Sequence, residues 1–407
     1  MDFEMHYTSE QEAFRKEVRE WLKENVPTGL AAAVNTGDLT ENTEERYWKS
    51  RDFRRKLGER GWLAPIYPKE YGGGGMNVAQ SIVIEEELAQ YDLPGTALGD
   101  LGLNLAAPAM MVWGTDEQKQ RFLPPILKGE VATWQVFTEP NAGSDLASMQ
   151  TTAIREGDEF VFNGSKHFVG SPHHVDFLYT LAVTDPNAPR HQNIGAFLVP
   201  ANTPGVSLGY MDLVAGGGKR TVFYDNARVP ASQLIGGERD GWKVAQSTLE
   251  LEHGGRGALI DKDRYLDKLL DYCRDTKHNG EPISSDPEYQ EYLLEAYVGY
   301  QVNRLLGLRN YWMRGARKRF SYEGSQGSMN RKVFAPKLAE IMLKTVGPRV
   351  LVSSKDPKWA IDGGRLESFQ REAIVIPHPG GTLEVQKLII ARRLGVSRTR
   401  EEGKDYF

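Results

Sequence analysis

The hydrophobic pattern of the chain changes its period twice, and this change constrains the fold more than any other feature. Up to about residue 130 the apolar residues recur at helical spacing, as Phe14, Val18, Trp21 and Leu22 do. From about 131 to 230, short runs rich in Val, Ile and Phe are separated by turn residues, which is typical of strands. After Gly241 the helical spacing returns. The pattern predicts an α+β protein: a helical part, a small antiparallel barrel or sandwich, and a second helical part.

Local signals place the boundaries of these elements. Ser9 is expected to cap the first helix, with Glu12 completing a capping box. Gly157-Asp158 and Asn163-Gly164 are expected to form hairpin turns. Helices are expected near 45–60, 77–91, 98–113, 259–275, 287–320 and 333–352, and strands at 133–138, 153–155, 160–162, 166–169, 177–183 and 195–199.

Composition excludes several classes of function. The 407 residues are enough for two or three domains, and the net charge of −5 argues against nucleic-acid binding and against a basic membrane-binding face. No apolar run approaches the roughly 18 residues of a membrane span, and the acidic start is unlike a signal peptide. The single cysteine, Cys273, excludes an intrachain disulfide and suits a reducing compartment, so a cytoplasmic location is expected.

The run Val136 to Asp145 is the strongest local candidate for a binding site. Its apolar start favours a strand, and Pro140, Asn141 and Gly143 then force a tight turn. Such a turn presents amide groups and the hydroxyls of Thr138 and Ser144, which suit the polar edge of a cofactor or a phosphate. Taken alone, the run fits an ordinary exit from a strand equally well.

Five segments, in order along the chain, resemble the motifs of the acyl-CoA dehydrogenase family. The run at 138–145, Thr-Glu-Pro-Asn-Ala-Gly-Ser-Asp, resembles the motif that opens the middle domain of that family. The others are Gly61-Trp62 with Pro68 to Gly73, Gly114 to Lys119 with Phe122-Leu123-Pro124, Asp225 to Pro230, and Gly380 to Gln386. The resemblance implies three domains at 1–130, 131–236 and 237–407: an N-terminal helical bundle, a middle antiparallel β-barrel and a C-terminal four-helix bundle.

The same resemblance implies that the barrel holds FAD. Positions that match the flavin contacts of the family are Gln135, Phe137, Thr138 and Ser144, followed by Phe168, Val169 and Gly170. Phe168 keeps an aromatic face for the flavin ring, whereas Gly170 lacks the hydroxyl that is usual there. Thr382 and Glu384 match contacts to the adenosine half of FAD, and the matching substrate positions are Ser144, His253 and Gly380.

Glu252 is the candidate catalytic base. It continues the helical face of Trp242, Ala245 and Leu249. A carboxylate there either turns toward water or is partly desolvated, which makes it a better base near neutral pH. Most of the family carries its base where this chain has Gly380. The run Leu249 to His253 resembles the branches that carry the base on the helix, which implies that Glu252 removes the proton. The backbone N–H of Gly380 can still stabilise an enolate oxygen.

Departures from the family pattern leave three functions open. The resemblance implies desaturation of an acyl-CoA, with electrons passed to an electron-transferring flavoprotein, in a homotetramer, a homodimer or a mixed α2β2 assembly. The usual Arg and Gln segments that complete a neighbouring FAD site are missing, as in steroid-side-chain branches. A non-catalytic partner subunit and a flavin enzyme with other chemistry therefore stay open. No metal is expected at the histidines His167, His173 and His174, because no Cys or carboxylate pattern accompanies them.

Overall fold

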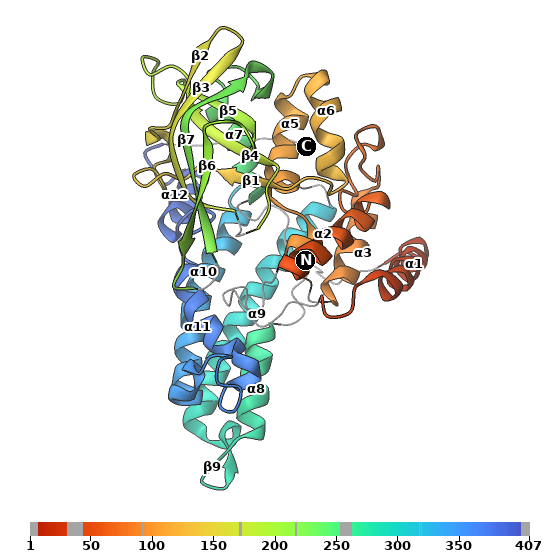
Figure 1. The fold of residues 1–407 in the computed structure, drawn as a ribbon. Coiled ribbons are helices and arrows are strands. Elements are labelled where there is room, and N and C mark those ends of the chain that lie inside the picture. The colour runs from red at the N-terminus through yellow and green to blue at the C-terminus, as the bar shows by residue number, and fades with distance from the viewer. Residues whose placement is uncertain are drawn as a thin grey trace.

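Helices and a sheet form one end of the molecule, and long C-terminal helices extend away from it (Figure 1). The structure, a computed structural model, describes residues 7–30, 44–91, 93, 95–170, 173–215, 218–252, 263–316, 318 and 320–399. The side chains of residues 95, 96, 249–252 and 264 lie outside this description. None of the helices in the described ranges has the length and apolar character that crossing a bilayer requires.

The N-terminal part is helical, as predicted, but its first cap lies one residue earlier than expected. Thr8 is the cap: its hydroxyl accepts from the amide of Gln11, and the Gln11 side chain accepts from the amide of Thr8. Thr8-to-Gln11 and Ser9-to-Glu12 both satisfy the capping-box pattern, so the pattern alone does not choose between them. The α-helices are α1 (Ser9–Asn25), α2 (Glu44–Glu59), α3 (Val78–Ala89), α4 (Gly95–Leu98), α5 (Ala107–Trp113) and α6 (Asp116–Leu127).

The helix expected at 98–113 is interrupted at Asp100. The Asp100 carboxylate accepts from the amides of Gly102 and Leu103, and a π-helical turn (Gly102–Ala106) then leads into α5. The same carboxylate accepts from the amide of Thr133 at 3.0 Å and pairs with buried Arg54 at 3.0 Å. Burial lowers the pKa of Arg54, and Asp100 opposes that shift. The interruption therefore ties the helical part to the first strand.

The middle part is a sheet, as predicted, and it is mostly antiparallel. Its strands run in the order β6-β7-β3-β2-β4-β5-β8, and β1 pairs with β4 in parallel. One further pair, between β2 and β4, is also parallel. The strands are β1 (Thr133–Val136), β2 (Thr152–Glu156), β3 (Glu159–Val169), β4 (Phe177–Val183), β5 (Ile194–Pro200), β6 (Val206–Asp212), β7 (Gly218–Pro230) and β8 (Leu234–Ile235).

Two predictions for the sheet need correction. The hairpin at Gly157-Asp158 is confirmed, but Asn163-Gly164 is not a turn: β3 continues through it, with a register shift against β7. Gly164 adopts a φ of 139°. This glycine therefore marks an irregular point within β3 and not the end of a strand. Strands β6 to β8 were not predicted, and the sheet extends to Ile235.

The C-terminal helices divide between two hydrophobic cores. Helix α7 (Gly241–Glu252) begins where predicted, and its buried Val244 and Ala245 belong to the core shared by the N-terminal helices and one face of the sheet. A separate core lies among the later helices. These are α8 (Arg264–Asp275), α9 (Pro287–Gly315), α10 (Glu323–Val346), α11 (Arg365–Val375) and α12 (Leu383–Arg393), with the hairpin β9 (Lys277–His278) and β10 (Glu281–Pro282). Helix α10 starts ten residues before the expected 333, and α11 and α12 were not predicted.

Candidate active site

Two segments that are 30 residues apart in the sequence meet at one end of the sheet. Phe137 and Thr138 directly follow β1, and His167 lies near the end of β3. The His167 amide donates to the Thr138 carbonyl at 2.8 Å. The structure thus brings together the two sets of positions that were matched to flavin contacts. Gln135 lies at the centre of β1, opposite Tyr179 of β4, and is half-buried.

Phe168 presents an aromatic ring to the outside at an irregular point in β3. The register against β7 shifts between Lys166 and Val169, as in a β-bulge. Phe168 adopts a φ of +57°, which is uncommon for a bulky residue, and its side chain is 58% exposed. Val169 is buried beneath it. An exposed aromatic ring held on strained backbone is a feature that clusters at ligand sites.

Gly170 is required by the packing below it. Its φ is +56°, and a Cβ added there would lie 2.1 Å from Cδ2 of Trp134, a buried residue of β1. Lys219 of β7 donates to the Gly170 carbonyl at 2.8 Å and helps to fix this backbone. A serine or threonine hydroxyl therefore has no room here unless Trp134 moves.

The loop that carries Ser144 is tied at its base and open at its tip. Glu139 and Ala142 exchange two backbone hydrogen bonds, of 3.0 and 3.2 Å. Ser144 is exposed, and a Cβ added to the neighbouring Gly143 would meet nothing within 4 Å. Asp145 pairs with Arg190 and accepts from Ser148. The Ser144 hydroxyl is thus accessible to a ligand.

A buried ion pair joins the base of this loop to β3. Lys166 Nζ lies 2.8 Å from Glu139 Oε1, and both side chains are buried. Burial lowers the pKa of Lys166 to about 8 even though Glu139 opposes that shift. Burial alone would raise the pKa of Glu139, but Lys166 and the donors of Thr151 and Gln150 outweigh it and hold that pKa below its usual value.

Helix α7 lies next to the same region, at Tyr179 of β4. The rings of Phe137 and Tyr179 lie 5.2 Å apart. Burial raises the pKa of Tyr179, and the neighbouring Thr248 side chain of α7 opposes the shift. Glu252 is four residues after Thr248, on the same face and about 6 Å further along the helix axis. The Glu252 side chain lies outside the described structure, as does His253.

The C-terminal candidate positions lie in a turn that packs against α10. Gly380 and Gly381 have φ values of 65° and 74°, and Thr382 caps α12 by accepting from the Val385 amide at 3.3 Å. The expected loop is therefore the start of a helix, with Glu384 exposed in its first turn. A hydrogen bond to its own backbone and one from Thr382 lower the pKa of Glu384.

Two buried polar side chains hold this turn. Gln386 is fully buried and donates to the Gly380 carbonyl at 2.8 Å. Lys332 of α10 is also buried and donates to the carbonyls of Ile376 and Pro379 at 3.1 and 2.5 Å. These hydrogen bonds fix the backbone from Ile376 to Gly380.

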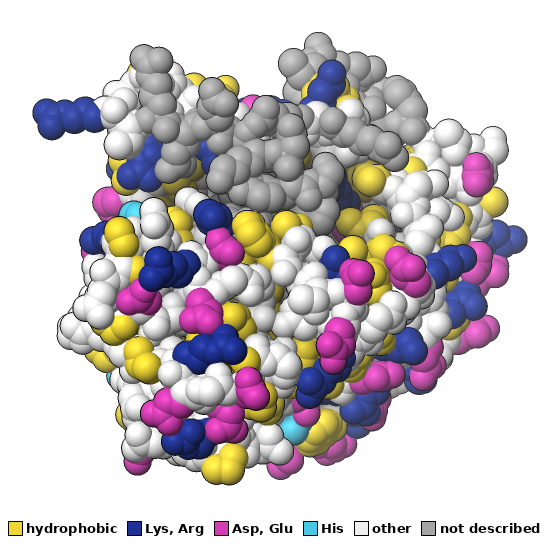
Figure 2. Space-filling view, turned by 90° about the horizontal axis from the view of Figure 1, so that it is seen from above, with side chains coloured by type: hydrophobic (Ala, Val, Ile, Leu, Met, Phe, Trp, Pro, Cys, Tyr) yellow, Lys and Arg dark blue, Asp and Glu magenta, His cyan; other side chains and the backbone are white. Residues whose placement is uncertain are grey.

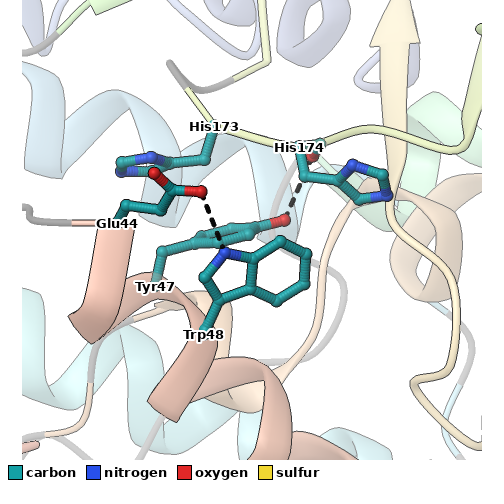
Figure 3. A pocket seen from close by; sticks show the side chains of 5 residues that line it. All are labelled: Glu44, Tyr47, Trp48, His173 and His174. Carbon is teal, nitrogen blue, oxygen red and sulfur yellow. Dashed lines mark hydrogen bonds between the residues drawn. The ribbon is translucent and has the colours of Figure 1, made fainter.

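A small pocket that the sequence did not indicate lies between the start of α2 and the histidines His173 and His174. It has a volume of about 330 Å³ and is lined by Glu44, Tyr47, Trp48, His173 and His174 (Figure 3). The rings of Tyr47 and His173 stack 4.8 Å apart, the Tyr47 hydroxyl donates to the His174 carbonyl at 3.0 Å, and Trp48 donates to Glu44. These contacts hold the histidines against α2. Among the described residues, no group of His, Cys, Asp and Glu could hold a metal ion.

Comparisons with known proteins agree over most of the chain. The models of the acyl-CoA dehydrogenase N-terminal, middle and C-terminal domains match residues 8–130, 135–222 and 239–395. The chain is 30% identical to "Acyl-CoA dehydrogenase FadE26" of Mycobacterium tuberculosis over 404 residues, which cover 96% of this chain and 98% of that protein.

Solved structures give the same result. The ChsE4-ChsE5 complex from Mycobacterium tuberculosis aligns with a TM-score of 0.81 at 28% identity, covering 98% of this chain and 100% of the matched chain. The Tcur3481-Tcur3483 steroid ACAD aligns with a TM-score of 0.79 at 28% identity, with the same coverage. From the matched domains and the shared fold, the chain belongs to the acyl-CoA dehydrogenase family of flavin-dependent oxidoreductases.

Proposed function

We propose that the chain is an FAD-dependent acyl-CoA dehydrogenase that introduces a double bond between the α and β carbons of an acyl-CoA thioester. The observation that carries this proposal is the meeting of the two candidate flavin segments, through the hydrogen bond from His167 to Thr138, beside an exposed aromatic ring at Phe168. Membership of the family supports it.

The residues at this site fit the polar and aromatic parts of a flavin. The Phe168 ring is exposed and available for stacking on the isoalloxazine ring, and Thr138 and Ser144 are proposed to supply hydroxyls from the other segment. Gln135, Val169 and Gly170 complete the flavin positions, and Thr382 and Glu384 are proposed for the adenosine half. When bound by these residues, FAD would supply the acceptor for the hydride that leaves the β carbon of the substrate.

Glu252 is the proposed base that removes the α proton. It stands at the end of α7, one turn beyond Thr248, whose side chain neighbours Tyr179, and this position supports the proposal. The α proton is only weakly acidic, so the thioester oxygen needs a donor as charge develops on it. The Gly380 amide is the proposed donor, and Ser144 and His253 are the proposed contacts to the rest of the substrate.

Flavin absorption tests this proposal. The purified chain is expected to take up one FAD, and a CoA ester that it accepts is expected to bleach the flavin without oxygen. Glu252→Gln is expected to keep the flavin and lose the bleaching. Glu250→Gln is the matched control, because it removes a carboxylate from the same helical turn on another face. Bleaching at the wild-type rate in Glu252→Gln would exclude Glu252 as the base.

One observation favours a second function, that of a non-catalytic partner subunit. Trp134 occupies the space that a hydroxyl-bearing side chain needs at position 170, so one contact of the usual flavin site is absent. A colourless chain that takes up no added FAD would support this function. A flavin-loaded chain that consumes oxygen with a substrate other than a CoA ester would instead support a flavin enzyme with other chemistry.

An exposed apolar stripe on α9 supports assembly into an oligomer. Its members recur at helical spacing, and each is at least two-fifths exposed: Leu294, Val298, Val302 and Leu305. We propose a homotetramer, a homodimer or a mixed α2β2 assembly, which the native mass of the chain alone and with a paralogous chain would distinguish. The proposed electron acceptor is an electron-transferring flavoprotein, and the proposed location is the cytoplasm.

A further inference from the structure

We infer that the buried pair of Glu139 and Lys166 is a positioning element that sets the two flavin segments against each other. This inference rests on the proposed function, because it assigns a role within the proposed flavin site. Its members are next to Thr138 and His167 in the sequence, and both of their side chains are buried. Apart from the ion pair itself, their hydrogen bonds go to the backbone of Phe137, Gln150 and Thr151, so we infer that both act through the backbone.

Lys166 connects β3 to the end of β1. Its side chain is fully buried, and its Nζ donates to the Phe137 carbonyl at 3.1 Å while lying 2.8 Å from Glu139 Oε1. The Met149 sulfur lies 4.0 Å away. A buried ammonium group is stable only where such acceptors surround it, so the positions of Phe137 and Glu139 relative to β3 are closely defined.

Glu139 connects the same point to the far end of the Ser144 loop. Its Oε2 accepts from the Gln150 amide at 2.6 Å, and its Oε1 accepts from the Thr151 amide at 2.9 Å. One carboxylate therefore closes the loop 140–149 and binds Lys166. The ion pair joins three segments: the end of β1, the start of β2 and the end of β3.

The backbone hydrogen bonds of the sheet do not connect β1 to β3. In the described structure β1 pairs with β4, whereas β3 pairs with β2 and β7. The ends of β1 and β3 are linked instead by the His167 amide and by the Lys166 side chain. The irregular backbone at Phe168 follows immediately, and such backbone persists only where its surroundings hold it. Lys166 supplies that support on the buried side.

A set of charge-removing variants separates positioning from stability. Lys166→Met alone leaves the Glu139 charge buried without its partner and is expected to weaken folding as well as flavin binding. The double variant E139Q/K166M removes both charges at similar volume, and such replacements are often neutral for stability. Arg228→Met is the matched control, because it removes an exposed ion pair on the same sheet. In that pair Arg228 Nη2 lies 2.8 Å from Glu156 Oε2.

Two measurements are made on each variant. The first is hydrogen exchange of peptides that cover 136–139 and 165–170 in the flavin-free protein. The second is the dissociation constant for FAD. In E139Q/K166M we expect about tenfold faster exchange in these peptides and about tenfold weaker FAD binding, as the loss of a hydrogen bond from a charged group implies, with an unchanged unfolding midpoint. The Arg228→Met control should match the wild type in both.

Wild-type exchange and FAD affinity in a stable double variant would overturn the inference and leave the pair with a role in folding alone. If the double variant fails to fold, the same two measurements are made on Glu139→Gln. This variant keeps a side-chain oxygen that can accept from the amides of Gln150 and Thr151. A wild-type chain that binds no FAD would contradict the proposed function. The exchange measurement would still decide the positioning role, since it needs no flavin.

Discussion

Raising the pH from about 7 to about 10 will stabilise the folded chain relative to the E139Q/K166M variant, because of Lys166. Burial lowers the pKa of this residue from 10.5 to about 8. Between these two values the unfolded chain holds more protons than the folded chain, so the free energy of unfolding rises with pH. The difference is about 2.5 pH units, and at 1.36 kcal/mol per unit it corresponds to about 3 kcal/mol.

Urea unfolding of both proteins at several pH values in this window measures the effect. Alkaline effects on the other groups are common to both proteins and cancel in the difference. The reasoning would be refuted if the wild type gained nothing relative to the variant. That result would mean that the attraction of Glu139 fully compensates the burial of the ammonium group, so that Lys166 keeps an ordinary pKa.

Three further perturbations test other parts of the structure. Gly170→Thr is expected to destabilise the fold by about 1–3 kcal/mol, because its Cβ would meet Trp134 at 2.1 Å; thermal unfolding measures this, and adding Trp134→Ala should recover part of the loss. Gln118→Ala removes two hydrogen bonds, of 2.9 and 2.7 Å, from α6 to the segment around β8, and a cost of about 1–3 kcal/mol in urea unfolding is expected; no change would mean that water replaces them. Burial alone would raise the pKa of Glu87, but the arginines of α1 outweigh it and lower that pKa. Glu87 therefore stabilises the fold at pH values above its unfolded pKa, and this stabilisation is lost as the pH falls through its folded pKa. Glu87→Gln should make the free energy of unfolding depend less on pH in the acid range.

The sequence predicts the order of the structural layers well, because that order depends on hydrophobic period. The switch near residue 131 and the return at Gly241 both coincide with changes in the structure, where β1 begins at Thr133 and α7 begins at Gly241. The two-residue turn at Gly157-Asp158 is also local and is found as predicted. Such features need only neighbouring residues for their stability.

Failures occur where distant residues decide the backbone. Asn163-Gly164 has the composition of a hairpin turn, yet β7 pairs on both sides of it and keeps the strand continuous. The helix expected at 98–113 is broken because the Asp100 carboxylate binds Arg54 and Thr133, which are remote in sequence. Tertiary contacts override local preference in both cases.

The candidate site also depends partly on contacts between residues that are distant in the sequence. The motif around Thr138 and the residues near Phe168 were each recognisable, but only the fold shows that the His167 amide reaches the Thr138 carbonyl. The contact of Gly170 with Trp134 depends on sheet packing and has no local signal. The roles of Glu252 and Gly380 remain predictions, and the Glu252→Gln variant tests the first of them.

The place of α7 in the hydrophobic cores decides how the chain can be divided into fragments. Val244 and Ala245 pack with the N-terminal helices and the sheet, whereas α8 begins the separate core of the later helices (Figure 1). A cut just before Gly241 would separate Val244 and Ala245 from the rest of the first core and expose the apolar side chains that they cover. A cut between α7 and α8 would keep that core closed. Figure 2 views the molecule from above and shows acidic and basic side chains interspersed over much of that face. Co-expressed pieces divided after α7 should therefore reassemble more readily than pieces divided before it.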